Sequence, residues 1–146
     1  MRGGPVVILH VEDEPAHAEI VRRNLSDFYP DHRLHHVADG QAALDYLYGR
    51  GEFRDAEKFP KPHLVLLDLR LPRVDGLEVL ETIKSDPALA NIPTVILTTS
   101  AAKADMTMAY RRHANSYLVK PLDFAQFVSL MESLGGYWLT LNVCPW

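Results

Sequence analysis

The chain has 146 residues, 47% of them hydrophobic, which suits one compact domain with a core of its own. Its 15 basic and 19 acidic side chains give a net charge of −4, which argues against nucleic acid as the main partner. The first residues hold a short apolar run followed by acids, which fits neither a signal peptide nor a membrane span. A single cysteine, Cys144, excludes an internal disulfide and a cysteine zinc site. We therefore expect a cytoplasmic domain that contacts neither nucleic acid nor membrane.

Short apolar runs alternate with helical patterns along the chain. The expected strands cover residues 6–11, 34–37, 64–67, 94–97 and 116–119. The expected helices cover residues 15 to about 30, 42–47, 76–84 and 103–112, and a last one runs to 134 from an N-cap at Asp123. Such βα units in series predict an α/β fold with a doubly wound, five-stranded parallel sheet, in the order 2-1-3-4-5, with helices on both faces.

Two segments depart from this alternation. Residues 49–62 are rich in charge, glycine and proline and lack apolar periodicity, which is typical of a surface loop. After Leu134, the pair Gly135-Gly136 is expected to break or bend the last helix. The last twelve residues carry no charged side chain, so they present apolar surface that needs to be covered.

The segment from Leu64 to Gly76, LVLLDLRLPRVDG, runs from four apolar residues straight into one carboxylate, Asp68. An unbroken apolar run indicates a central strand that is covered on both faces. Asp68 then lies at the carboxyl end of that strand, where ligands bind in open α/β sheets. An aspartate after a single strand would more simply open a turn. The residues at the ends of the other strands are therefore needed to distinguish a turn from a functional site.

The residues at the ends of the other strands favour a functional site that includes Asp68. If the first, third, fourth and fifth strands lie together, their carboxyl ends gather polar side chains along one edge: Glu12, Asp13, Asp68, Thr98 and Lys120. Crowded carboxylates raise one another's pKa unless a cation lies among them, and oxygen ligands with room for water and phosphate suit Mg²⁺. An aspartate beside Mg²⁺ can act as a nucleophile on a phosphoryl group, which Lys120 and Thr98 would contact.

Four motifs stand at these strand ends, in the order VEDE, LLDLRLPRVDG, LTTS and YLVKP. With this pattern, from about residue 6 to 134, the chain resembles the receiver domain of bacterial two-component response regulators. The resemblance implies that Asp68 accepts a phosphoryl group from a histidine kinase. It also implies that Mg²⁺ is bound by Asp13, Asp68 and the backbone carbonyl of Arg70, with Glu12 contributing, often through water. Such a domain is not an enzyme in the usual sense, because it catalyses only its own phosphotransfer and dephosphorylation.

The same resemblance assigns a switch to two residues, Thr98 and Tyr117. It assigns Lys120 to the lysine of the family's site and implies a cis peptide bond at Pro121. Tyr117 could instead be an ordinary aromatic side chain of the sheet.

Three further segments narrow the resemblance. The GRGEF loop, the segment HANSYLVKP and the tail GGYWLTLNVCPW are similar to single-domain regulators of cyanobacterial and bacterial phytochrome histidine kinases. This implies a receiver domain at 1–134 and an extension at 135–146 that helps to form a homodimer. The residues we assign to the dimer contact are Phe127, Tyr137, Trp138 and Leu141. In the alternative, the tail folds back onto its own subunit.

Two other classes of function stay open. An aspartyl-phosphate hydrolase or mutase would carry a second Asp two residues after the nucleophile, where this chain has Arg70. A flavodoxin-like mononucleotide-binding protein would carry a phosphate loop rich in Ser, Thr and Gly after its first strand. This chain has Glu12-Asp13-Glu14 there, which would repel a phosphate in the absence of metal.

The seven histidines do not indicate a metal site. His35 and His36 are neighbours on one strand and therefore point to opposite faces of the sheet. We expect His10 to be buried in its strand and the other histidines to be solvated.

Overall fold

The computed structural model describes residues 4–146. Its parallel sheet has the order β2-β1-β3-β4-β5, as the sequence predicted. The strands are β1 (Val6–Val11), β2 (His32–Val37), β3 (Leu64–Leu67), β4 (Thr94–Thr98) and β5 (Ser116–Val119). Every residue of β1, β3 and β4 is buried, which fits apolar runs without alternation in the middle of a sheet.

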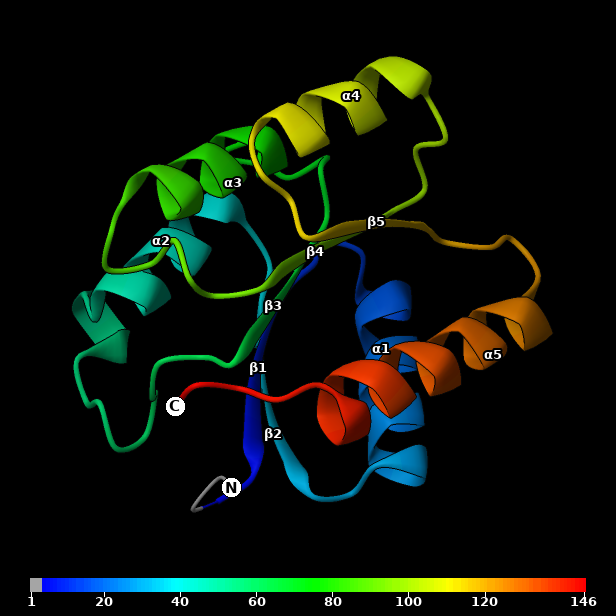
Figure 1. Cartoon of the computed structure of the whole chain (residues 1–146), viewed down its shortest axis with the longest axis horizontal. Helices are drawn as coiled ribbons and strands as arrows, with labels where there is room; N and C mark the ends of the chain where they lie inside the picture. Colours follow the sequence, from blue (N-terminus) through cyan, green and yellow to red (C-terminus); the bar gives the residue numbers. More distant parts are fainter. Residues whose placement is uncertain (1–3) are drawn as a thin grey trace.

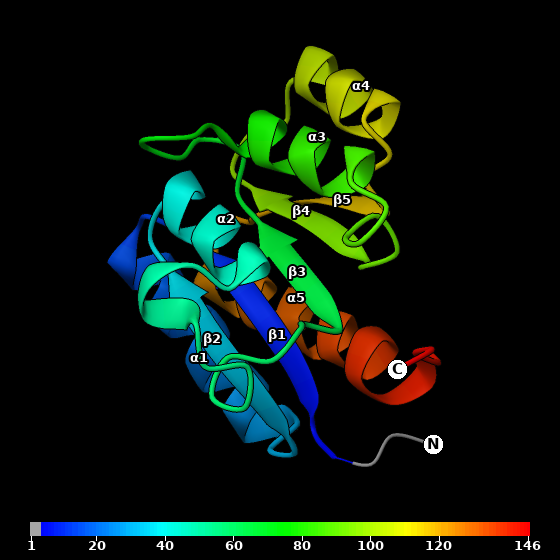
Figure 2. The same ribbon diagram turned by 90° about the vertical axis from the view of Figure 1, so that its left-hand side faces the viewer.

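Helices cover both faces of the sheet. They are α1 (Pro15–Phe28), α2 (Gly40–Tyr48), α3 (Gly76–Ser85), α4 (Lys103–Arg111) and α5 (Phe124–Gly135). Helices α1 and α5 lie side by side on one face, and α2, α3 and α4 cover the other (Figures 1 and 2). The core is accordingly split into two apolar clusters, one on each side of the sheet. Among the described residues, no helix is both long enough and apolar enough to span a bilayer.

Four of the helices begin with an acidic side chain that accepts backbone N–H groups. Glu14 caps α1, Asp39 caps α2 and Asp75 caps α3. Asp123 accepts from the N–H groups of Ala125 and Gln126, so the predicted N-cap of the last helix is confirmed. Glu14, Asp39 and Asp123 each place the start of a helix shortly after the carboxyl end of the preceding strand.

Residues 49–62 are more than the surface loop that we expected. The segment contains a short 3₁₀ helix, Gly51–Phe53, and buries Phe53 to 8% exposure. Phe53 and Phe59 pack with Tyr46 and His35, with ring centroids 5.1–5.9 Å apart. We call these four residues the aromatic cluster. Most of the segment is exposed, as predicted for a surface loop, but the buried Phe53 was not predicted, because two phenylalanines six residues apart supply a core contact without producing any periodic pattern.

The pair Gly135-Gly136 does not break the last helix. Helix α5 runs through Gly135 and continues as a π-helical turn, η2 (Gly136–Leu141). A Cβ atom on Gly135 would lie 2.3 Å from the ring of Tyr29, whose hydroxyl donates to the carbonyl of Glu132 (2.7 Å). The glycines thus give the Tyr29 ring room to pack against the helix, and they join the end of α1 to α5.

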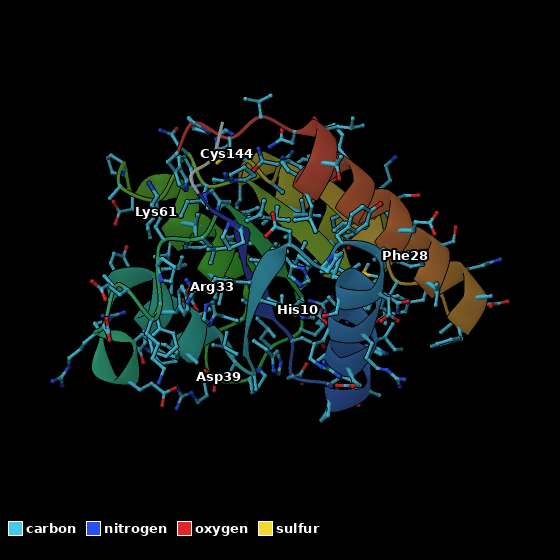
Figure 3. All side chains as sticks on the ribbon, turned by 90° about the horizontal axis from the view of Figure 1, so that it is seen from below. His10, Phe28, Arg33, Asp39, Lys61 and Cys144 are labelled. Carbon is cyan, nitrogen blue, oxygen red and sulfur yellow. The ribbon has the colours of Figure 1, made fainter. Side chains whose placement is uncertain are left out.

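The tail after η2 returns across the amino ends of the central strands (Figure 1). His63 accepts the Val7 N–H at Nδ1 (2.9 Å), so its neutral ring donates from Nε2 to the Trp146 carbonyl (3.1 Å). The Trp146 ring stacks on His63 and lies 4.2 Å from the Lys61 ammonium. Figure 3 shows Cys144 of the tail on the same side of the molecule as Lys61.

The residues that we assigned to the dimer contact differ in their exposure to solvent. Phe127 is 2% exposed and belongs to the core of its own chain, so this assignment was wrong. The reason is that Phe127 lies on the side of α5 that faces the sheet and α1. Trp138 packs in part against the same core cluster. Tyr137 and Leu141 are 51% and 73% exposed and remain available to a partner.

Candidate functional site

The carboxyl ends of β1, β3 and β5 bring three charged side chains together. Glu12, Asp68 and Lys120 follow these strands directly and are 1%, 7% and 4% exposed. The Lys120 ammonium donates to Asp68 Oδ2 at 2.8 Å and to Glu12 Oε1. The Lys120 N–H donates to the Thr98 carbonyl (2.7 Å), so β4 fixes the backbone from which this side chain extends.

The loop after β3 holds Asp68 in place. The Asp68 N–H donates to the Val11 carbonyl (3.1 Å), and the Arg70 N–H donates to Asp68 Oδ1 (3.2 Å). Gly76 comes back against this backbone: a Cβ atom there would lie 2.1 Å from the Asp68 carbonyl oxygen. Only glycine permits this approach, which explains the Asp-Gly pair at the end of the motif.

Glu12, Asp13 and Asp68 offer carboxylate oxygens within 4.8 Å of one another, and Asp13 is exposed. When ionised, three carboxylates beside one ammonium leave two negative charges, which a divalent cation would balance. Carboxylate oxygens suit hard cations such as Mg²⁺ or Mn²⁺. Arg70, whose carbonyl is the remaining predicted ligand, lies in the same loop as Asp68 and donates its N–H to that side chain. The residues present therefore fit a divalent metal.

The two buried acids, Glu12 and Asp68, differ in the direction of their pKa shifts. Burial raises the pKa of Glu12 to about 7, although the Lys120 ammonium acts in the opposite direction. Burial also acts to raise the pKa of Asp68, but Lys120, the Arg70 N–H and the Thr98 hydroxyl together lower it below its ordinary value. Asp68 is thus the acid that these neighbours hold ionised, as a nucleophile must be.

Thr98 and Tyr117 lie beside this site. Thr98 is fully buried, and its hydroxyl oxygen accepts from the Ser100 N–H (3.4 Å). Tyr117 packs in part against the core and donates its hydroxyl to the Ser100 carbonyl (2.9 Å). Both predicted switch residues therefore contact one short segment between β4 and α4.

An ion pair that the sequence did not reveal extends this network. The Arg70 guanidinium donates to Asp105 of α4 (2.6 Å), which also accepts from the Ser100 hydroxyl (2.5 Å). The side chain of Arg70 is thus turned toward α4. No spacing in the sequence pairs these residues, because the contact depends on how α4 packs beside the loop after β3.

The histidines are less solvated than we expected. His10 is buried as predicted, and burial lowers its pKa to about 3. Contrary to the prediction, His17 is half-buried and its Nδ1 lies 3.1 Å from the Lys120 ammonium, whereas His36 is exposed as predicted, although its Nε2 lies 2.7 Å from the Glu12 carbonyl oxygen. These contacts form only when β1, β2, α1 and β5 come together, so local sequence cannot show them. Figure 3 labels His10 in the interior of the molecule.

One implied backbone feature is absent. The Lys120–Pro121 peptide bond is trans, since the described residues contain no cis peptide bond. Trans is the intrinsically preferred isomer before proline. The cis bond inferred from the resemblance was therefore wrong.

Comparison with known proteins agrees with this geometry. Residues 8–132 match the family described as Response regulator receiver domain. The chain is 44% identical to the probable methanogenesis regulatory protein FilR2 of Methanothrix harundinacea, over 97% of this chain and 88% of that protein. It is 40% identical to the response regulator Rcp1 of Synechocystis sp., over 97% of this chain and 94% of that protein.

Solved structures give the same result. The phosphorylated cyanobacterial phytochrome response regulator RcpA superposes with a TM-score of 0.91 and is 36% identical, covering 97% of this chain and 99% of its own. The Mn²⁺-bound form of Rcp1 has a TM-score of 0.91 and is 39% identical, covering 97% of this chain and 100% of its own. The chain belongs to the response regulator receiver family, and its fold and acidic cluster are those of a phosphotransfer signalling domain.

Proposed function

We propose that Asp68 accepts a phosphoryl group from a phosphohistidine of a sensor kinase. The observation that carries this proposal is the buried 2.8 Å contact between Asp68 Oδ2 and the Lys120 ammonium. In the transfer, a carboxylate oxygen of Asp68 forms a bond to phosphorus while the P–N bond breaks, and the electron pair stays on the imidazole nitrogen. Lys120 and the Thr98 hydroxyl then face the phosphoryl oxygens and offset their negative charge.

Intact-mass measurement after treatment with acetyl phosphate and Mg²⁺ tests this assignment. The wild-type protein gains one phosphoryl mass and loses it slowly to water, whereas Asp68→Asn gains none. Asp31→Asn, on an exposed turn, is the matched control and behaves like the wild type. Equal uptake by Asp68→Asn and the wild type would overturn the choice of Asp68.

The metal of this site is proposed to be Mg²⁺, held by Asp13, Asp68 and the Arg70 carbonyl, with Glu12 in support. When bound, it supplies positive charge that offsets the charge of the carboxylate and phosphoryl oxygens. Asp13→Ala removes a direct ligand, so Mg²⁺ affinity measured by calorimetry falls at least tenfold. Arg70→Ala leaves the backbone carbonyl in place and keeps the affinity within about twofold. Equal loss in both variants would show that the Arg70 side chain holds the metal.

The Arg70 side chain is proposed to shield the phosphoryl group from water. It is paired with Asp105 at 2.6 Å, so shielding requires that this ion pair open. Asp105→Asn weakens the pair and frees Arg70, which slows dephosphorylation about threefold, whereas Arg70→Ala accelerates it. If both variants lose phosphate at the wild-type rate, Arg70 has no such role.

Phosphorylation is proposed to act through Thr98 and Tyr117. A phosphate of charge about −1.5 to −2 at Asp68 draws the Thr98 hydroxyl toward it and biases the position of Tyr117. The support is that both side chains already contact Ser100. Thr98→Ala accepts phosphate but transmits less to the surface of α4, β5 and α5. Identical amide exchange over residues 103–134 with and without phosphate would contradict this coupling.

The extension at 135–146 is proposed to form a homodimer contact. A groove of about 520 Å³ lies between β5, α5 and η2, and its lining includes Leu118, Leu130, Tyr137 and Trp138. Tyr137 of this lining is exposed, as is Leu141 at the end of η2, and a two-fold contact would cover this apolar surface. Light scattering then gives near twice the chain mass for the wild type and near one for Tyr137→Ser/Leu141→Ser. A monomeric wild type at micromolar concentration, with and without phosphate, would overturn the dimer.

The partner is proposed to be a phytochrome histidine kinase. The support is the similarity to Rcp1 and to the phytochrome response regulator RcpA along nearly the whole chain. FilR2, named for methanogenesis, matches the same share of this chain, 97%. A phytochrome kinase should transfer phosphate to this chain in seconds, and much faster than a kinase of another sensor class. The cytoplasmic location and the absence of nucleic-acid or membrane contact stay predictions.

A further inference from the structure

The Lys120 ammonium has three side-chain contacts, and the sequence anticipated only two of their partners. Its N–H groups are directed to Glu12 Oε1, Asp68 Oδ2 (2.8 Å) and His17 Nδ1 (3.1 Å). A lysine ammonium carries three N–H donors and no acceptor, so these contacts use its full hydrogen-bonding capacity. His17 must therefore accept at Nδ1, which places the proton of the neutral ring on Nε2.

The His17 ring is held in this position from a second side. It lies in the first turn of α1, which begins at Pro15 behind the Glu14 cap. Its centroid is 6.0 Å from the ring of Phe127, a buried residue of α5. Two helices and the end of β5 thus fix one imidazole beside the site.

We propose that His17 is a positioning residue that holds the Lys120 ammonium above Asp68 throughout the phosphorylation cycle. The inference rests on the proposed role of Asp68. Phosphorylation would convert the Asp68 carboxylate into an acyl phosphate, and the metal would compete for Glu12, so both carboxylate contacts of Lys120 change during the cycle. His17 takes part in neither event. It also satisfies one N–H without neutralising the ammonium, which keeps its positive charge for the phosphoryl group.

The surroundings of His17 favour the neutral ring that this role requires. Burial and the Lys120 charge lower its pKa below 6.5, whereas neighbouring carboxylates act in the opposite direction. A protonated ring could not accept from Lys120 and would place a second positive charge against it. Several elements contribute the groups that face His17. They are Lys120 after β5, the α1 cap Glu14, His10 of β1, Asp13 after β1, Asp68 after β3 and the uncharged Phe127 of α5.

Two substitutions distinguish the effect of the Nδ1 acceptor of His17 from the effect of the rest of its side chain. His17→Leu removes the acceptor and keeps an apolar side chain beside Phe127. His17→Asn keeps an oxygen acceptor near the place of Nδ1 but cannot titrate. With acetyl phosphate and Mg²⁺ at pH 8, His17→Leu phosphorylates about tenfold more slowly than the wild type, and His17→Asn recovers to within about twofold. His32→Leu, at the amino end of β2, is the matched control and keeps the wild-type rate.

The pH profile distinguishes positioning from a structural effect. The wild-type rate falls on the acid side as His17 takes a proton, and this part of the profile is missing from His17→Asn. Nitrogen NMR of the wild type should show His17 protonated at Nε2, with Nδ1 as the acceptor, even if a variant fails to fold. A proton on Nδ1, or equal rates for His17→Leu and the wild type from pH 6 to 8, overturns the proposal. A wild type that takes up no phosphate would instead refute the role of Asp68.

Discussion

Two regions of this molecule bury polar or ring side chains, and they do so in opposite ways. At the carboxyl edge of the sheet, Glu12, Asp68 and Lys120 bring charges of both signs out of water. In the aromatic cluster, Phe53 and its neighbours hold a loop by ring contacts, with His35 among them. Buried ion pairs contribute little net stability, whereas buried aromatic rings contribute a great deal. The comparison indicates that the charged edge is kept for chemistry and the aromatic cluster for stability.

The strongest test of this difference is Lys120→Met. Removing the ammonium leaves two buried acids without their cation, so the free energy of unfolding falls by about 3–5 kcal/mol at pH 7.5, measured by urea denaturation. Mg²⁺ restores part of this loss, because it supplies another cation to the same carboxylates, while phosphate uptake is lost. Unchanged stability in the absence of metal would show that the acids do not depend on Lys120.

Phe53→Ala tests the aromatic cluster. Phe53 is 8% exposed, and truncating a buried phenylalanine costs about 3 kcal/mol of unfolding free energy. Phosphate uptake per folded molecule stays at the wild-type level, in contrast to Lys120→Met. Phe124→Ala, at a ring that is 65% exposed, changes stability by less than about 0.5 kcal/mol and is the matched control. A loss of phosphate uptake in Phe53→Ala would show that the two regions are coupled.

The aromatic cluster also makes stability depend on pH through His35. Burial and the Arg33 charge lower the pKa of His35, so the unfolded chain binds its proton more tightly than the folded chain. Its contribution to stability is fully present above about pH 6.5 and is lost as pH falls through the lowered pKa. In urea unfolding from pH 8 to 5, His35→Phe therefore loses less stability than the wild type. His113→Asn, on an exposed turn, should keep the wild-type dependence; identical slopes for all three proteins would contradict this account.

The smallest expected effect comes from an exposed lysine that contacts a half-buried ring. Lys61 lies 4.2 Å from the Trp146 ring but remains exposed, and such a cation–π contact is worth about 0.5–1 kcal/mol. Lys61→Met should lower the unfolding free energy by no more than this amount and leave phosphate uptake unchanged. A loss as large as that of Lys120→Met would remove the distinction between a buried and an exposed lysine.

The sequence predicts most of the fold because its strands are apolar runs with sharp ends. β1, β3 and β5 have the expected bounds, and the order of the strands then places Glu12, Asp68 and Lys120 together. What the sequence could not supply are contacts that depend on how helices pack. The contact of His17 with Lys120 and the pairing of Arg70 with Asp105 are of this kind.

Glycine and phenylalanine were misread for a related reason. The Gly135-Gly136 pair indicates backbone freedom, yet the same lack of side chain can admit a neighbouring ring, here that of Tyr29. Isolated Phe53 and Phe59 in a charged segment give no periodic signal, although both pack in the core. In each case the partner lies elsewhere in the chain, and local pattern does not identify it.

The packing of Tyr29 against the end of α5 has a consequence for synthesis of the chain. Tyr29 and Glu132, which share a hydrogen bond, are 103 residues apart, and α1 and α5 cover the same face of the sheet. While the protein is being translated, the apolar side of α1 and that face of β1 and β3 stay uncovered until the last helix leaves the ribosome. Contacts between distant parts of a chain form slowly and expose apolar surface in the meantime. A nascent chain that stalls before residue 124 therefore presents this surface to chaperones, and docking of α5 is the step that ends its exposure.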